Sequence, residues 1–174
     1  IREKQKVIKL LTEQKQELIN KAITRGIDPN VRLKPSGINW LGEIPDHWKV
    51  LPLKRVAWFK GGCGFPHNFQ GEKNLEIPFF KVSDMTLDGN DVLMKSHNNS
   101  ISREVARELG ATVFLEDTII FPKVGGAMLT NKRRITTKPS CIDNNMMGCV
   151  ITKNIALDFL FLKEYMCYLQ SLKT

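Results

Sequence analysis

The first 25 residues constrain this chain most, because they contain neither glycine nor proline. They are rich in Lys, Glu, Gln and Leu, which all favour an α-helix. Gly26 directly follows this segment and Pro29 comes three residues later, a combination that stops a helix. This pattern therefore predicts a single helix over residues 1–26, about 37 Å long at about 1.5 Å per residue.

Apolar residues recur along this helix at the heptad spacing that is typical of coiled coils. They are Ile1, Ile8, Leu11, Leu18 and Ala22. A helix cannot cover its own apolar stripe, so the stripe needs a partner. Two arrangements are open: the helix packs on its own domain, or it forms a coiled-coil arm with another helix. Without such a partner, the exposed stripe is expected to promote self-association.

Residues 27–52 are expected to form an ordered connector, because prolines and glycines interrupt a stretch that is too apolar for a flexible tether. Trp40 and Trp48 should pack onto the domain that follows, with a base-stacking platform as the alternative. Beyond the connector, short β-branched or aromatic segments alternate with turns. Strands are predicted at 53–60, 77–82, 112–115, 118–121, 134–137 and 146–152. Helices are predicted at 102–109, between an N-cap at Ser102 and a stop at Gly110, and at 154–172. The expected fold class is thus a mixed α/β (α+β) one, in which a long helix precedes a globular domain of short strands.

The chain carries a formal net charge of +8 at pH 7, and the excess lies in two blocks. Residues 1–35 hold nine Lys or Arg against four Asp or Glu, and residues 118–153 hold six against one. Such an excess points weakly toward a polyanion such as nucleic acid. No apolar run approaches the roughly 18 residues of a membrane span. The four cysteines form no C-x-x-C pair, which indicates reduced thiols in a cytoplasmic protein without a zinc site.

Common catalytic motifs are missing from the sequence. There is no G-x-G-x-x-G fingerprint, no G-x-x-x-x-G-K-[ST] loop and no G-x-S-x-G elbow. The Asx-Pro-Pro-aromatic signature of amino-methyltransferases is absent too, and His47, His67 and His97 do not lie at metal-ligand spacing. The sequence therefore predicts a binding protein that is not an enzyme and holds no metal.

Three polar loops, at 61–71, 81–85 and 122–134, separate the predicted strands. Lys and Arg side chains neutralise phosphates, whereas Asn and Arg suit the edges of adenine and guanine. On a strand, side chains alternate between faces, so at least two of the three cations at 132–134 are expected to point to solvent or phosphate. The alternative is that these loops are ordinary solvated or packed turns. The candidate DNA-binding residues are Asn68, Lys81, Lys123, Asn131, Lys132, Arg133, Arg134 and Asn144.

Four stretches of the sequence carry a family resemblance. They are residues 13–19 (EQKQELI), 22–31 (AITRGIDPNV), 36–48 (SGINWLGEIPDHW) and 119–126 (IIFPKVGG). The first three closely resemble the junction between the central conserved region and the second target recognition domain in the DNA specificity subunit of Type I restriction-modification systems. The fourth is similar to the loop-bearing part of such a recognition domain.

The resemblance implies a subunit with two recognition domains, each of which reads one half of a split target in double-stranded DNA. It also implies two conserved helices that pair, set the spacer and dock the modification subunits, which the restriction subunits then join. S-adenosylmethionine, ATP and Mg are expected on those partners, and no cofactor on this chain. Residues 1–26 would be one conserved coiled-coil helix, 27–52 the connector, and 53–174 one recognition domain, truncated at its C-terminal end. The alternative is a protein–protein scaffold module without a DNA surface of its own.

Overall fold

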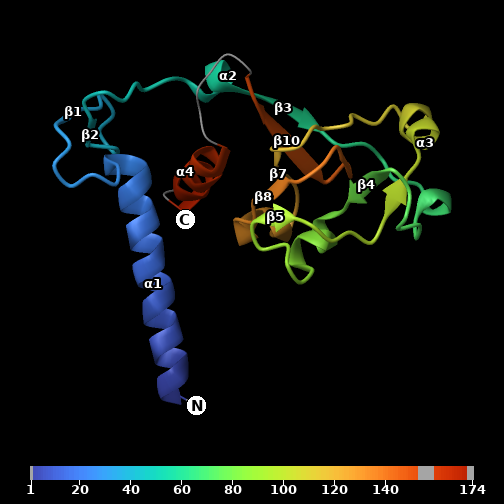
Figure 1. Ribbon diagram of the computed structural model, residues 1–174, viewed down its shortest axis with the longest axis horizontal. Coiled ribbons are helices and arrows are strands. Elements are labelled where there is room, and N and C mark those ends of the chain that lie inside the picture. Colours follow the sequence, from blue (N-terminus) through green and yellow to red (C-terminus); the bar gives the residue numbers. More distant parts are fainter. Residues whose placement is uncertain (1, 153–158, 172–174) are drawn as a thin grey trace.

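The computed structural model describes residues 2–152 and 159–171, and Figure 1 shows a helical rod attached to a strand-rich part. The rod is α1 (Arg2–Arg25), which confirms the predicted helix. It ends because Gly26 adopts a φ of +79°, and the Gly26 amide donates to the Ala22 carbonyl at 3.0 Å. Only glycine adopts such a left-handed conformation without strain. The mixed α and β content confirms the predicted fold class.

The connector folds into a small antiparallel ribbon of β1 (Leu33–Pro35) and β2 (Glu43–Pro45). It lies beside α4 (Phe159–Ser171), the helix that packs against α1. The Trp48 ring meets the Phe161 ring edge-on, with 5.5 Å between the centroids, and the Trp40 and Tyr168 ring centroids are 6.5 Å apart. Both tryptophans therefore contact a helix of the part that follows, as predicted.

Two sheets form the strand-rich part of the molecule. The five-stranded sheet has, in order, β3 (Ala57–Gly61), β10 (Met146–Ile151), β7 (Ile119–Pro122), β8 (Arg134–Thr136) and β5 (Leu93–Met94). The three-stranded sheet has β6 (Ser100–Ile101), β4 (Ile77–Phe80) and β9 (Cys141–Ile142). All neighbours are antiparallel except the pairs β5–β8 and β4–β9. The short helices are α2 (Leu53–Val56), α3 (Arg103–Glu108), η1 (His67–Phe69), η2 (Val82–Thr86) and η3 (Gly126–Thr130).

The core lies on both faces of the five-stranded sheet. Successive side chains of a strand point to opposite faces, so Ile119 joins one buried cluster and Ile120 another. Leu162 and Met166 are four residues apart on α4 and cover the first face. The second face carries a cluster around Phe114, which lies under Trp58 with ring centroids 6.4 Å apart. Burial on both faces explains why β7 is an unbroken apolar run.

Most predicted elements of the strand-rich part are confirmed; of the strand predicted at 53–60 only the part from 57 onward is a strand, β3, and the strand predicted at 112–115 is wrong. The strands at 77–82, 118–121, 134–137 and 146–152 correspond to β4, β7, β8 and β10. In α3, the Val105 amide donates to the Ser102 hydroxyl at 3.2 Å, which confirms the N-cap. The strand predicted at 53–60 begins instead as α2, because the Arg55 amide bonds the Pro52 carbonyl at 2.9 Å. The strand predicted at 112–115 is a single bridge between Phe114 and Ser140. Of the helix predicted at 154–172, residues 154–158 and 172 lie outside the described residues.

Candidate nucleic-acid interface

Four loops begin at one edge of the two sheets. The amides of Gly62 and Cys63 donate to the Met146 and Ile142 carbonyls at 3.2 and 3.1 Å. The Lys123 amide donates to the Asn145 carbonyl at 2.9 Å, just beyond the end of β7. These backbone bonds, with that from the Asp143 amide to the Phe80 carbonyl at 3.0 Å, fasten the ends of β3, β4 and β7 to the start of β10. We call this region the loop edge; its candidate contact residues are Asn68, Lys81, Lys123 and Asn144.

The loops approach each other closely because two residues here lack a side chain. A Cβ atom on Gly62 would lie 2.1 Å from the Ile142 carbonyl oxygen and 2.2 Å from that of Asp143. A Cβ atom on Gly61 would lie 2.7 Å from Nζ of Lys123, so the Lys123 ammonium rests directly over the backbone of β3. Glycine is thus required at Gly62 for the packing of one loop on another.

Lys81 is held at the loop edge by two neighbours. Its ammonium donates to Oε1 of Gln70 at 3.1 Å, and its backbone amide donates to Oδ2 of Asp84 at 2.8 Å. Asp84 is completely buried and also accepts from the Asn98 side chain at 3.0 Å. This segment is therefore a packed turn, the alternative that the sequence left open for these loops, and Asp84 caps backbone amides. Lys81 itself is half-buried and keeps its charge close to the surface.

Asp143 places a second carboxyl behind the loop edge. It is 5% exposed, and its Oδ1 accepts from the Asn145 amide at 3.0 Å. Burial raises the pKa of this carboxyl above its ordinary value, and the neighbouring Asp84 adds to the rise, while the bonds from Asn145 and the charge of Lys81 oppose it. Asn144, next in the chain, is exposed, as is Asn68 in η1.

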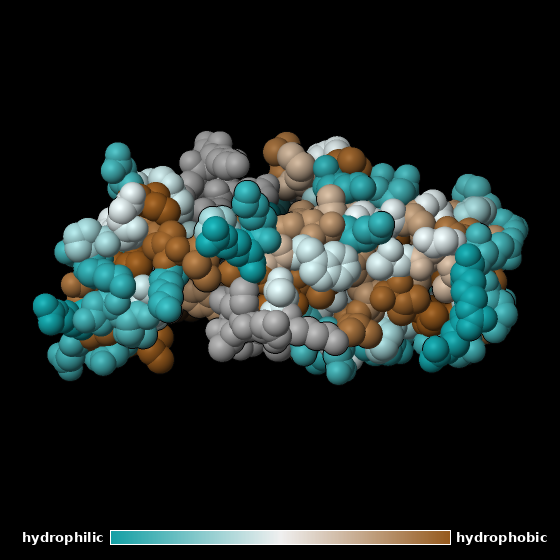
Figure 2. Space-filling model, turned by 90° about the horizontal axis from the view of Figure 1, so that it is seen from above, coloured by the Kyte–Doolittle hydropathy of each residue, from teal (hydrophilic) through white to brown (hydrophobic). Residues whose placement is uncertain are grey.

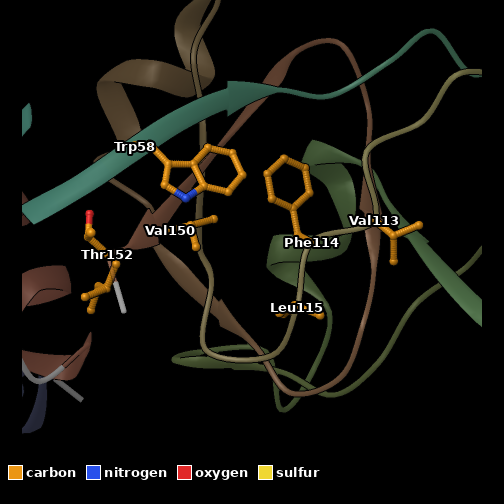
Figure 3. Close-up of a pocket in the computed structure, with 7 residues that line it drawn as sticks. Trp58, Val113, Phe114, Leu115, Val150 and Thr152 are labelled. Carbon is orange, nitrogen blue, oxygen red and sulfur yellow. The ribbon is translucent and has the colours of Figure 1, made fainter. Parts of the chain in front are cut away.

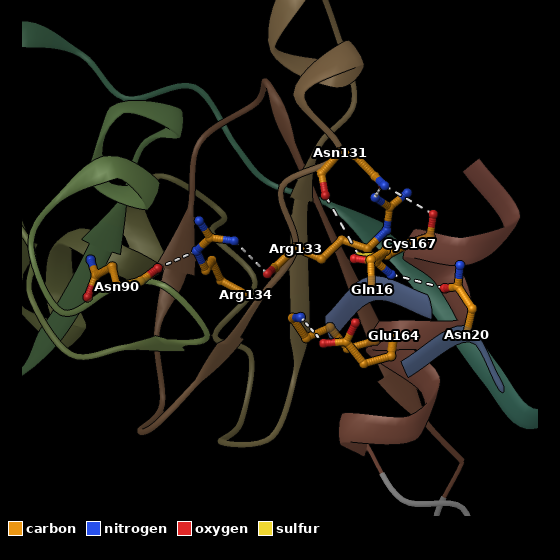
Figure 4. A network of polar contacts seen from close by, with 9 residues as sticks. Gln16, Asn20, Asn90, Asn131, Arg133, Arg134, Glu164 and Cys167 are labelled. Carbon is orange, nitrogen blue, oxygen red and sulfur yellow. Dashed lines mark hydrogen bonds and ion pairs between the residues drawn. The ribbon is translucent and has the colours of Figure 1, made fainter. Parts of the chain in front are cut away.

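Two of the three consecutive cations, Arg133 and Arg134, do not point outward as expected, because their guanidinium groups bond other residues of the chain. Arg133 is 7% exposed, its Nη1 donates to Oδ1 of Asn131, and burial lowers the pKa of its guanidinium. Arg134 donates from its guanidinium to the carbonyls of Asn90, Arg133 and Met85, the latter two at 2.9 and 3.3 Å, as Figure 4 shows for Asn90 and Arg133. At least two of the three were expected to point outward, and this is wrong, because the bonds of Arg133 and Arg134 leave only half-buried Lys132 for that role.

Arg134 finds partners because the segment from Met85 to Asn90 offers its carbonyl groups. Asn90 is buried, and its side chain bonds four backbone groups, among them the Ser96 carbonyl at 2.7 Å and the Lys95 amide at 2.8 Å. Sequence reasoning missed Asn90 and Gln70 as residues that hold the loops. The one available signal was the polar turn at 88–91, shortly after the predicted loop at 81–85.

Two apolar surfaces lie away from the loop edge. The first is the predicted stripe of α1, where Ile8, Leu11 and Leu18 are 63%, 59% and 68% exposed, while Ala22 is half-buried near α4. The second is an open hollow of about 510 Å³ at the opposite end of β10, lined by Trp58, Phe114, Leu115 and neighbouring residues (Figure 3). On the face that Figure 2 shows, hydrophobic residues lie exposed among hydrophilic ones. In the described part of the chain, no helix is both long and apolar enough to cross a bilayer.

Comparison with known proteins defines the class of this fold. No family model and no curated protein matches the sequence. Among solved structures, the HsdS subunit from Thermoanaerobacter tengcongensis aligns over 98% of this chain and 38% of its own length, with a TM-score of 0.57 and 15% identity. A chain from the structure that describes complex assembly and conformational transition of the type I R-M system aligns over 97% and 38%, with a TM-score of 0.54 and 14% identity.

The fold is therefore that of a rod joined to a mixed α/β domain, and it is the fold found in HsdS specificity subunits of Type I restriction-modification systems. This chain spans about 38% of the length of those subunits.

Proposed function

We propose that this chain is part of the specificity subunit of a Type I restriction-modification enzyme, where it binds double-stranded DNA and reads one half of a bipartite target. The observation that carries the proposal is the loop edge, where four polar loops meet on an HsdS-like fold. Lys123 there lies over the backbone of Gly61, which has no side chain in the way. Such an edge can approach a duplex closely, as groove reading requires.

The residues of the loop edge divide into two roles in this proposal. Lys81, Lys123 and the nearby Lys132 neutralise phosphates, because all three lysines are partly exposed. Asn68 and Asn144 reach base edges, because both are exposed and an amide can bond adenine at two atoms. Arg134 supports the loops from within, since its guanidinium is committed to backbone carbonyls.

Partner subunits supply the chemistry in this proposal. The apolar stripe of α1 docks a paired helix and the modification subunits, which bind S-adenosylmethionine and transfer the methyl group. The restriction subunits then join the assembly with ATP and Mg. The support on this chain is the exposure of the stripe at Ile8, Leu11 and Leu18, because a stripe of that size is normally covered.

A salt titration of DNA binding tests the proposal. The logarithm of the binding constant should fall linearly with the logarithm of salt, by about 0.9 for each neutralised phosphate. Lys123→Ala should reduce this slope by about 0.9. Lys54→Ala is the matched control, because Lys54 is exposed in α2 at the other end of β3, and its slope should not change. A flat titration, or equal effects of the two substitutions, would refute the proposed surface.

The second candidate is a protein–protein scaffold without a DNA surface, which the exposed stripe of α1 favours. It predicts little affinity for any duplex, and binding to modification subunits that Lys123→Ala leaves intact. Measuring both interactions on the same variants separates the two candidates.

A further inference from the structure

We propose that Asn131 and Arg133 are positioning residues, which fasten the 123–133 loop to α4 and do not themselves contact DNA. This inference rests on the proposed function, because it concerns how a DNA-binding loop is positioned. The attachment of the loop to α4, however, can be measured in the free protein. It assigns these two residues a role inside the molecule that the sequence did not indicate.

The first support is a set of reciprocal bonds between the loop and α4. Nδ2 of Asn131 donates to the Cys167 carbonyl at 3.0 Å, and Sγ of Cys167 donates to the Asn131 carbonyl at 3.8 Å. Asn131 holds a left-handed conformation, with a φ of +52°, which turns its side chain and carbonyl toward the helix. Nη1 of Arg133 donates to Oδ1 of the same Asn131 side chain. The amide of Asn131 thus joins the arginine to the helix.

The second support is the burial of Arg133. Its side chain is 7% exposed, and its guanidinium carbon lies 5.4 Å from the centroid of the Phe121 ring on β7. To reach a phosphate, this arginine would have to leave both the ring and the Asn131 bond. Lys132, the preceding residue, is more exposed and can supply a charge to DNA without such a rearrangement. The two neighbouring cations therefore have different roles.

The third support is the packing of α4 against α1 and the connector. It packs against α1, and Phe161 and Tyr168 bring it against the tryptophans of the connector. The fastening therefore joins the loop to the rod through one helix. A protein that reads half of a split target needs this constraint, because the loop must keep a constant distance from the element that sets the spacer.

The test compares Arg133→Met with Lys132→Met in salt titrations between about 50 and 200 mM, with a mixed-sequence duplex as the probe. A stoichiometric titration first determines the active fraction of each preparation. Arg133→Met should weaken binding about tenfold at every salt concentration without changing the slope, since a charge-assisted bond is lost but no phosphate contact. Lys132→Met should reduce the slope by about 0.9. A reduced slope for Arg133→Met, or unchanged affinity, would overturn the inference.

Hydrogen exchange of the free protein separates this inference from the proposed function. Asn131→Gly removes the side-chain bonds while glycine tolerates the positive φ. Exchange should become faster in both the 123–133 loop and α4, while β7 and β10 keep their protection. Faster exchange in the loop alone, or in neither, would overturn the fastening. If the wild-type protein bound no duplex, the proposed function would fail, and the exchange result would still decide whether the loop is fastened.

Discussion

Replacing Gly62 with alanine is the sharpest single perturbation of the loop edge. The new Cβ atom would lie 2.1 and 2.2 Å from two backbone oxygens, and backbone cannot rotate aside as a side chain can. Relief requires the 61–71 loop to separate from residues 142–146, which breaks the amide bonds of Gly62 and Cys63 to the Met146 and Ile142 carbonyls. Each such bond contributes about 1 kcal/mol and the residual overlap adds about 1 kcal/mol. The free energy of unfolding should therefore fall by about 3 kcal/mol.

Thermal and urea denaturation measure this change. For a chain of 174 residues, about 3 kcal/mol corresponds to a Tm lower by about 6–12 °C. The matched control is Gly64→Ala, two residues along the same loop, where no atom lies within 4 Å of the added Cβ. Its Tm should stay within about 2 °C of the wild type. Equal stability of the two variants would refute the description of the loop edge, and Gly62→Ala should also weaken DNA binding.

Three further predictions follow from contacts elsewhere in the chain. Gly148→Ala should lower the Tm, because its Cβ would lie 2.4 Å from the buried Phe114 ring, and Phe114→Leu in the same chain should restore part of the loss in a double-mutant cycle. Burial raises the pKa of Asp143, so ionisation of this carboxyl opposes folding, and the stability of the wild type falls as the pH rises above the ordinary Asp pKa. Asp143→Asn lacks this ionisation and should therefore become more stable relative to the wild type between about pH 3 and pH 7. A stability difference that stays constant over this range would contradict the prediction. Leu11→Gln with Leu18→Gln should reduce self-association in sedimentation velocity without lowering the Tm, and unchanged sedimentation would show that the stripe forms no contact between copies.

Elements with a periodic pattern or a cap could be predicted from the sequence. The rod follows from a segment without glycine or proline, and α3 follows from Ser102 and Gly110. β1, β2, β5, β6 and β9 were not predicted, because each has only two or three residues and, unlike the equally short β8, none lies in a run of β-branched residues. These short strands form because they pair with neighbouring strands, and not because their own sequences favour a strand.

The positions of the loops at the candidate site could be predicted from the sequence, but the burial of its arginines could not. Lys81, Lys123 and Asn144 leave strands at one edge, and turn residues in the sequence indicated those loops. A run of three cations reads as an exposed cluster by composition alone. Its burial depends on the carbonyls of Asn90 and Met85, more than 40 residues earlier in the chain, which turn toward Arg134 only in the folded protein. Such long-range partners leave no local signal.

Above all, we propose that this chain supplies part of the DNA sequence specificity of a Type I enzyme. Its most direct test is a map of methylated sites in cells that express the chain with its modification subunits, compared with the same map for Asn68→Ala combined with Asn144→Ala. For the wild type we predict a methylated motif in two parts. For the double variant we predict that one half of this motif changes or becomes less specific, while the other half and the spacer stay the same. Identical maps for the two proteins, or methylation without any two-part motif, would contradict the claim.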